Sequence, residues 1–143
     1  MEILITDHHG WAKIYYSNNW LTSHQNGDDW CLCVLYSNLG DNVGWMGTQS
    51  FAGNNQTNGK YVTAVGYPGK LKNQYINRGT INQTYTGYFE TDALLVEGMS
   101  GGPLYLTPYD TAVGINKARY EDGHAAIQTR ITSEIIDLIK ANS

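Results

Sequence analysis

The sequence predicts an all-β protein built as an antiparallel barrel or sandwich. Charged residues make up only 15% of its 143 positions, against about 25% in an average domain. Its polarity comes instead from 16 glycines, 11 tyrosines and many Asn and Thr residues. Gly and Asn favour turns, whereas Tyr and Thr favour strands. The apolar stretches are short and alternate with turn signals, as they do in sandwiches and barrels.

Short apolar or β-branched runs define the expected strands in chain order. These runs cover residues 12–16, 31–36, 43–46, 60–66, 75–81, 84–90, 103–106, 112–117 and 125–131. The turn-forming sequences between them are SNN, HQNGDD, SNLGDN, FAGNNQTNGK, YPGK, EGMSGG, TPYD and RYEDG. Gly, Asn, Asp and Pro dominate these separators because they adopt turn conformations readily.

One helix is expected, at the end of the sequence. Thr132 or Ser133 can cap its first turn, where the acidic Glu134 is also favourable. An apolar stripe follows at helical spacing, formed by Ile135, Ile136 and Ile139. We therefore expect a C-terminal helix that packs against the strands.

Cys31 and Cys33 lie two residues apart in the run CLCVLY. Neighbours at this spacing in a strand share one face, so they do not form an ordinary disulfide. Two cysteines are also too few ligands for a metal site. We expect both to be small buried hydrophobic residues, and the sequence indicates no metal or other cofactor.

The charge balance and the lengths of the apolar runs argue against two classes of partner. The chain has nine Lys and Arg residues and thirteen Asp and Glu residues, which gives a net charge of −4. A mildly acidic chain without a basic run is not typical of nucleic-acid binding. No apolar run approaches the roughly 18 residues of a membrane-spanning helix. We therefore expect neither a nucleic-acid partner nor a membrane partner.

The segment EGMSGGP, residues 97–103, surrounds Ser100 with glycines. Such a loop turns tightly and brings its backbone close to a ligand. The amides of Gly98 and Ser100 could then stabilise an oxyanion beside the Ser100 hydroxyl. An ordinary glycine-rich hairpin turn explains the same pattern equally well.

Asp28 and Asp29 precede the apolar run of residues 30–35. Either carboxylate could be a solvated strand end, or it could orient a histidine as in a catalytic triad. Composition alone does not choose between these roles or between the two residues.

Four stretches together resemble the chymotrypsin-fold serine peptidases, and within them the V8-like glutamyl endopeptidases. GMSGGP resembles the nucleophile motif G-x-S-G-[GS]-P, and DWCL resembles the motif that supplies the triad aspartate. VTAVGYPGK resembles the segment V-x-G-Y-P-G, and AVGINKA followed by RITSEIIDLI resembles the closing strand and terminal helix. The resemblance runs from about Trp11 to the end of the chain.

The resemblance implies a role for each matching residue. Ser100 would be the nucleophile and Asp29 the orienting carboxylate, with the Gly98 and Ser100 amides as the oxyanion hole. The residues of the substrate pocket would be Leu94, Leu95, Asn116 and Ala126. Peptides or proteins would be the substrates, and the protein would be secreted.

The same resemblance implies a division of the chain. Residues 1–36 would be the remnant of an N-terminal barrel, residues 37–131 a complete C-terminal barrel and residues 132–143 the terminal helix. A first barrel of so few strands has unpaired edges. We therefore expect a missing N-terminal segment, a partner chain or a remodelled N-terminus.

The chain departs from the family in its histidines. The general base should lie roughly 40 residues before Asp29, but only 28 residues precede it. His8, His9 and His24 lie too close, and His124 falls in a distant turn. A serine without a base is a poor nucleophile, so we expect little activity from this chain alone. His8 and His9 are the next candidates if it is active.

Two further departures concern activation and specificity. Met99 cannot form the activating ion pair that an Asp makes at this place in trypsin-like relatives. Asn116 stands where glutamate-specific relatives carry a histidine, so a preference for glutamate is only weakly supported. We expect Lys117 and Arg119 to be solvated charges.

Three functions are therefore in view. The first is a serine endopeptidase, and the second is a non-catalytic relative that keeps the barrel as a binding module. The third is a carbohydrate- or ligand-binding barrel, suggested by four Trp and eleven Tyr residues. Aromatic residues in strands more often pack in the core or across strands, so the third function has the least support.

Overall fold

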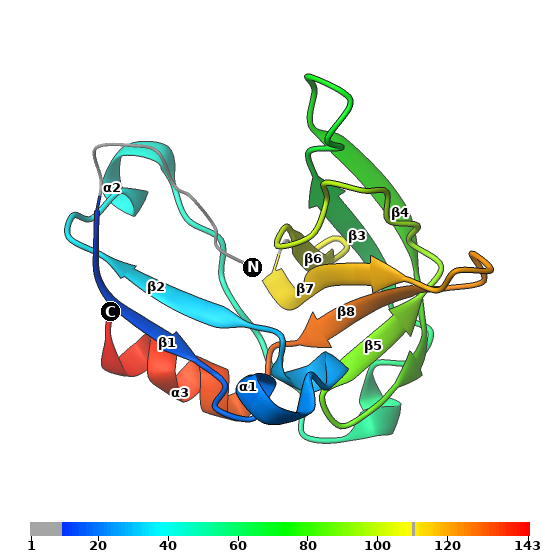
Figure 1. Ribbon diagram of the computed structural model, residues 1–143, viewed down its shortest axis with the longest axis horizontal. Coiled ribbons are helices and arrows are strands. Elements are labelled where there is room, and N and C mark those ends of the chain that lie inside the picture. Colours follow the sequence, from blue (N-terminus) through cyan, green and yellow to red (C-terminus); the bar gives the residue numbers. More distant parts are fainter. Residues whose placement is uncertain (1–9, 110) are drawn as a thin grey trace.

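The computed structural model describes residues 10–109 and 111–143. A closed barrel and a two-stranded sheet lie side by side, with a helix beneath the sheet (Figure 1). The sheet consists of β1 (Trp11–Tyr16) and β2 (Cys31–Leu35). The barrel strands are β3 (Tyr61–Gly66), β4 (Tyr75–Thr84), β5 (Tyr88–Thr91), β6 (Pro103–Leu106), β7 (Thr111–Arg119) and β8 (Ala126–Arg130). The helical segments are α1 (Trp20–Ser23), η1 (Asn26–Asp28), α2 (Gly40–Val43), η2 (Asn54–Gln56) and α3 (Ser133–Ala141).

The barrel is antiparallel throughout and closes in the order β3-β4-β5-β8-β7-β6. Its interior is filled by apolar side chains from every strand and from the loop before β6. The buried members include Val62, Ala64, Ile81, Phe89, Leu95, Met99, Leu104, Val113 and Ala126. Strand β5 shows the expected period of two, since Phe89 and Thr91 are buried while Tyr88 and Glu90 are partly exposed. The predicted all-β fold with a complete antiparallel barrel is confirmed.

The β1–β2 sheet has a different character. Its two strands pair with each other and with no barrel strand, in a register that places Tyr16 opposite Cys31. Ile14 is 44% exposed. Cys31 is exposed and Cys33 only partly covered, and both are free thiols. The prediction that both cysteines are buried is therefore wrong, because the sheet has too few layers to cover them.

Helix α3 joins the two regions. Thr132 is its N-cap, and its hydroxyl accepts a hydrogen bond from the Ile135 amide at 3.5 Å. The apolar stripe packs in a second cluster with Trp30 and the barrel residues Ala112 and Ile131. At the other end, the Tyr15 hydroxyl of β1 donates to Asn142 Oδ1 at 3.1 Å. The predicted helix and its packing role are confirmed.

Segment η1 also contacts the barrel. The Thr129 hydroxyl of β8 donates to the Asn26 carbonyl at 2.8 Å. Gly27 and Gly87 lie so close that a β-carbon on either would sit 2.6 Å from the α-carbon of the other. Both positions therefore need glycine for the backbones to approach this closely.

Three expected strands, at residues 43–46, 75–81 and 84–90, differ from the structure. Residues 43–46 form no strand, because the chain coils into α2 and leaves it at Gly44 with φ of 82°. The strand expected to end at residue 81 continues to Thr84, and β5 is correspondingly short. The hairpin turn between them closes with the Tyr85 amide donating to the Tyr88 carbonyl at 2.9 Å.

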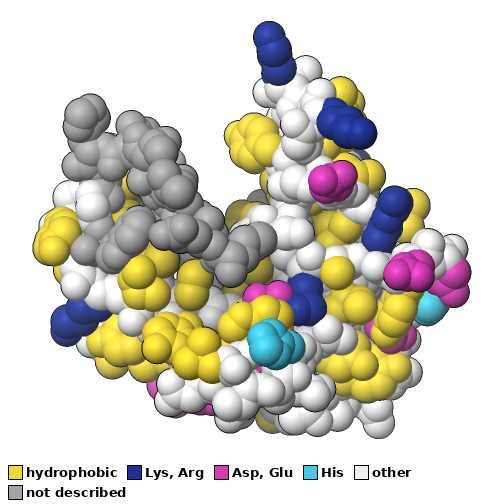
Figure 2. All heavy atoms as spheres, viewed as in Figure 1, with side chains coloured by type: hydrophobic (Ala, Val, Ile, Leu, Met, Phe, Trp, Pro, Cys, Tyr) yellow, Lys and Arg dark blue, Asp and Glu magenta, His cyan; other side chains and the backbone are white. Residues whose placement is uncertain are grey.

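The surface shown in Figure 2 carries Lys and Arg side chains singly rather than in one patch. Among the described residues, no helix is long and apolar enough to cross a membrane. The barrel strands span Tyr61–Arg130, inside the predicted segment 37–131.

Candidate functional site

Ser100 lies on an exposed loop between β5 and β6, and glycines set the shape of this loop. Gly98 and Gly101 have φ of 97° and 85°, a region that side chains other than glycine rarely adopt. A β-carbon at Gly98 would overlap backbone atoms of Tyr67 and Gly69. The Gly69 amide donates to the Glu97 carbonyl at 2.9 Å. The segment after β3 thus holds the serine loop in place.

The amides of this loop divide into two groups. Those of Met99, Gly101 and Gly102 donate to backbone carbonyls at 2.8–3.1 Å. Those of Gly98 and Ser100 donate to no described residue. The two amides that the family resemblance assigns to the oxyanion hole are therefore available to a ligand.

Ser100 and Asp29 each form a hydrogen bond with Lys117. The Ser100 hydroxyl donates to the Lys117 carbonyl at 2.8 Å. The Lys117 ammonium donates to Asp29 Oδ2 at 2.6 Å, and the two side chains are 15% and 35% exposed. The same ammonium lies 4.5 Å from the ring centroid of Trp20, a favourable cation–π distance. The expectation that Lys117 is a solvated charge is therefore wrong.

A β-bulge explains how Lys117 reaches both residues. Asn116 pairs with Gln128 and Ala118 pairs with Ile127, so Lys117 is the extra residue on β7. Bulges bend a strand and re-aim its side chains. Sequence reasoning missed Lys117 and Trp20; the one available signal was a single lysine that follows the apolar stretch AVGIN.

The two adjacent aspartates have different partners. Asp28 Oδ1 accepts a hydrogen bond from the Ser17 hydroxyl at 2.7 Å, whereas Asp29 pairs with Lys117. Asp29, the residue selected by the family motif, is thus the one on the side of Ser100. Its role in orienting a base stays a prediction.

The four predicted pocket residues lie in different environments. Leu94 is 50% exposed, while Leu95 and Ala126 belong to the barrel core. Asn116 is buried on β7, and its Nδ2 donates to the Val65 carbonyl at 2.8 Å. Its Oδ1 has no partner among the described residues, and neither polar atom of the buried Gln128 opposite has one.

No histidine of the described residues contacts Ser100. His24 packs edge-to-face on Trp20, with the ring centroids 5.0 Å apart. Trp20 in turn contacts Lys117, so His24 and Lys117 share this neighbour. His124 pairs with Asp122, and its backbone N–H is the main cause of the lowered pKa of that carboxyl. His8 and His9 lie outside the described residues. Within the same residues, no group of three His, Cys, Asp or Glu side chains is placed to hold a metal ion.

Comparison with solved structures shows which proteins share this architecture. A Glu endopeptidase in complex with MPD matches with a TM-score of 0.79 at 18% identity, over 93% of this chain and 63% of that one. A thermostable serine protease, AL20, from an extremophilic microorganism matches with a TM-score of 0.62 at 20% identity, over 87% and 61%. The HtrA-type protease AlgW with a decapeptide matches with a TM-score of 0.58 at 21% identity, over 82% and 38%.

These structures establish a shared fold, and this chain spans less than two thirds of each of them. No curated protein sequence matches the chain. The family model of the trypsin-like peptidase domain matches residues 6–115, a range that contains both Asp29 and Ser100. That match covers most of the sequence, and the chain belongs to the trypsin-like peptidase family.

Proposed function

We propose that Ser100 is the nucleophile of a serine-endopeptidase site whose activity in this chain alone is low. The observation that carries this proposal is the pair of amides at Gly98 and Ser100, which donate to no residue that the structure describes and lie next to the exposed Ser100 hydroxyl. Attack of Ser100 Oγ on a peptide carbonyl carbon would place the developing oxyanion against these two N–H groups. Collapse of that intermediate would expel the amine and leave an acyl-enzyme.

The environment of Asp29 supports the low activity. A general base must remove the Ser100 proton and later give it to the leaving amine. The Lys117 ammonium has no lone pair to accept that proton, and it occupies the carboxylate that would orient an imidazole. In addition, the Ser100 proton is directed to the Lys117 carbonyl rather than to a base. Loss of one triad member typically removes several orders of magnitude in rate.

The alternative is a peptide-binding module without catalysis. The Asp29–Lys117 ion pair favours this function, because it engages the Asp29 carboxylate in a contact that does not involve a general base. AlgW, one of the similar structures, is described with a bound decapeptide. Under this alternative the amides of Gly98 and Ser100 would hold a peptide carbonyl without reaction.

A fluorophosphonate probe separates the two functions, because it modifies only an activated serine. We expect slow labelling at Ser100, identified by mass spectrometry of the tryptic peptide. Ser100→Ala should abolish the labelling, and Ser133→Ala, on the exposed start of α3, should leave it unchanged. Hydrolysis of fluorogenic peptides should be barely measurable in the same preparation.

Each outcome decides between the proposals. Complete absence of labelling after prolonged exposure would support the binding module. Rapid peptide hydrolysis that disappears in Ser100→Ala would contradict the low activity and direct attention to His8 and His9.

Secretion and completion of the first barrel also stay proposals. The low charge and the richness in Gly, Asn and Tyr support an extracellular protein. The two-stranded β1–β2 sheet supports completion by a preceding segment or a partner chain, since within residues 10–109 and 111–143 its strands pair only with each other. Size-exclusion chromatography at several concentrations would test whether this chain associates with itself.

A further inference from the structure

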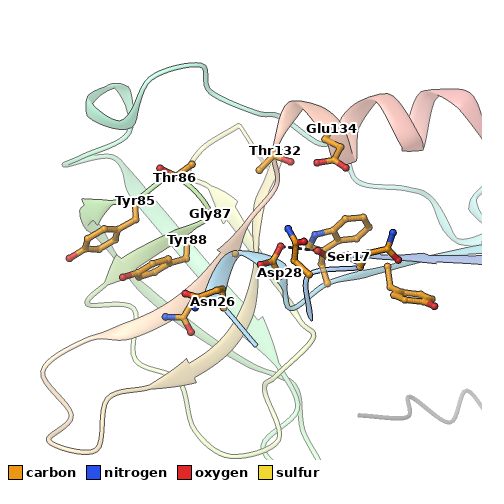
Figure 3. A pocket seen from close by; sticks show the side chains of 15 residues that line it. Ser17, Asn26, Asp28, Tyr85, Thr86, Gly87, Tyr88, Thr132 and Glu134 are labelled. Atoms are coloured by element: carbon orange, nitrogen blue, oxygen red, sulfur yellow. Dashed lines mark hydrogen bonds between the residues drawn. The ribbon is translucent and has the colours of Figure 1, made fainter. Parts of the chain in front are cut away.

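A cavity of about 700 Å³ lies apart from Ser100. Four segments form its walls: the residues after β1, segment η1, the turn between β4 and β5, and the start of α3. Figure 3 shows Tyr85 and Tyr88 at one end and Thr132 with Glu134 on one wall, facing Asp28 and Ser17. The family resemblance assigns no role to this cavity.

Hydrogen bonds within the protein fix the walls of this cavity in the absence of a ligand. The Ser17 hydroxyl donates to Asp28 at 2.7 Å, and Thr129 holds the Asn26 carbonyl at 2.8 Å. On the opposite side, Arg130 donates to the Tyr85 carbonyl at 3.0 Å through Nη1 and to the Gly87 carbonyl at 2.9 Å through its amide. A cavity with fixed walls binds a ligand with little cost in ordering.

The charges on the lining exclude anionic ligands. Asp28 and Glu134 are the acidic residues of the wall, and no Lys, Arg or His is among the residues that line it. A phosphate, sulfate or free carboxylate would meet two like charges and no compensating cation.

The hydrogen-bonding groups of the lining distinguish between the two remaining kinds of ligand, cations and neutral polyols. The lining carries carboxamide side chains at Asn18, Asn19, Gln25 and Asn26. Each carboxamide both donates and accepts, whereas an ammonium or guanidinium ligand can only donate. A cation would therefore leave the amide donors unused. Hydroxyl groups of a polyol both donate and accept, and they match amides and carboxylates together.

The aromatic residues specify the shape of the ligand. The rings of Tyr85 and Tyr88 stack with centroids 4.4 Å apart and an angle of 13°, and Trp30 and Tyr16 also line the cavity. A stacked pair presents a flat apolar surface that suits the C–H face of a pyranose ring, while phenol and indole polar atoms remain available. Apolar platforms combined with a few convergent polar groups are typical of small-ligand sites.

We propose that this cavity binds a neutral oligosaccharide, with one sugar ring against the Tyr85–Tyr88 pair and hydroxyls on Asn26, Asp28 and Glu134. The site is distinct from the proposed peptidase site, because none of its lining residues forms a hydrogen bond, ion pair or ring contact with Ser100 or Lys117. It would place a glycan next to the peptidase fold without involving the serine.

The test is titration of the full chain with neutral hexasaccharides, followed by calorimetry and by NMR line broadening of the sugar. The probes are maltohexaose, cellohexaose, xylohexaose, mannohexaose and chitohexaose. We expect at least one to bind with a dissociation constant of about 1 mM or tighter. Tyr85→Ala and Asn26→Ala should each weaken it by about tenfold or more. Ser100→Ala should leave sugar binding unchanged.

Two control variants replace the same residue types, a tyrosine and an asparagine, at positions outside the cavity. Tyr109→Ala removes an exposed tyrosine of the barrel, and Asn55→Ala removes an exposed amide in η2; both should bind sugar as the original chain does. Tyr85→Phe keeps the ring and should retain most of the affinity. A thermal melt of each variant confirms folding, and the Asn26 change leaves its bonded carbonyl in place.

Three results would overturn the proposal. The first is no binding of any of the five sugars, and the second is sugar binding that survives both cavity variants. The third is tight binding of spermidine or hexalysine that Glu134→Gln abolishes, with no sugar binding, which would make the cavity a cation site.

Discussion

The barrel and the β1–β2 sheet are built from similar strands but are stabilised differently. In the barrel each strand pairs on both sides, and apolar side chains meet in one enclosed core. In the β1–β2 sheet each strand has one partner among the described residues, and even the apolar Ile14 is nearly half exposed. The comparison teaches that closure, rather than strand composition, produces the core. The proposed active site lies where the two regions meet, because Ser100 belongs to the barrel region and Asp29 precedes β2 of the open sheet.

The largest expected effect comes from the barrel core. Phe89 is fully buried, so Phe89→Ala should lower the free energy of unfolding by about 3–5 kcal/mol. Ile14→Ala in the open sheet should cost no more than about 1 kcal/mol. Urea unfolding followed by circular dichroism measures both. Equal losses would show that the β1–β2 sheet is as well packed as the barrel.

An intermediate effect is expected at the ion pair that joins the two regions. Lys117→Met and Asp29→Asn each remove a charged hydrogen bond and should cost about 1–2 kcal/mol. The double variant should cost less than the sum, with a coupling energy of about 1 kcal/mol. The coupling should fall as salt is added, because the Asp29 side chain is partly exposed. Strict additivity would mean that the contact does not hold the regions together in solution.

The smallest effect concerns a thiol of the open sheet. Burial of part of the side chain, and then the neighbouring Cys33, raise the pKa of Cys31. A raised pKa leaves less thiolate at neutral pH, and the thiolate is the reactive form. Iodoacetamide should therefore alkylate Cys31 several-fold more slowly than an unstructured cysteine peptide at pH 7, and the difference should shrink as the pH rises. Mass spectrometry of timed samples measures this; equal rates at pH 7 would contradict it.

Local patterns predicted most of the barrel. The strand predicted at residues 103–106 has the bounds that the structure has, and of the two predicted caps of α3, Thr132 and Ser133, the structure has Thr132. The failures lie where tertiary context decides. The run VGWM at 43–46 is apolar enough for a strand, but Gly44 follows a helical turn there and no strand offers it a partner.

The candidate site divides in the same way. Sequence motifs predicted roles for Ser100, Gly98 and Asp29 because each lies in a short characteristic pattern, and these roles stay predictions. Lys117 has no such pattern, since its contacts depend on a bulge in β7 and on residues 88 and 97 positions earlier in the chain, Asp29 and Trp20. The prediction that Cys31 and Cys33 are buried was wrong for a related reason. The sequence shows that a strand is apolar, but it does not show how many layers of structure cover it.

The contact between Gly27 and Gly87 constrains how this chain can change over evolutionary time. Each glycine excludes a side chain at the other, although sixty positions separate them. A substitution at either position is blocked as long as the opposite backbone stays where it is. Segment η1 and the β4–β5 turn therefore have to be compatible at this point, and a chimera that brings in either segment with a side chain at the contact position would not seat its N-terminal region on the barrel without a backbone shift.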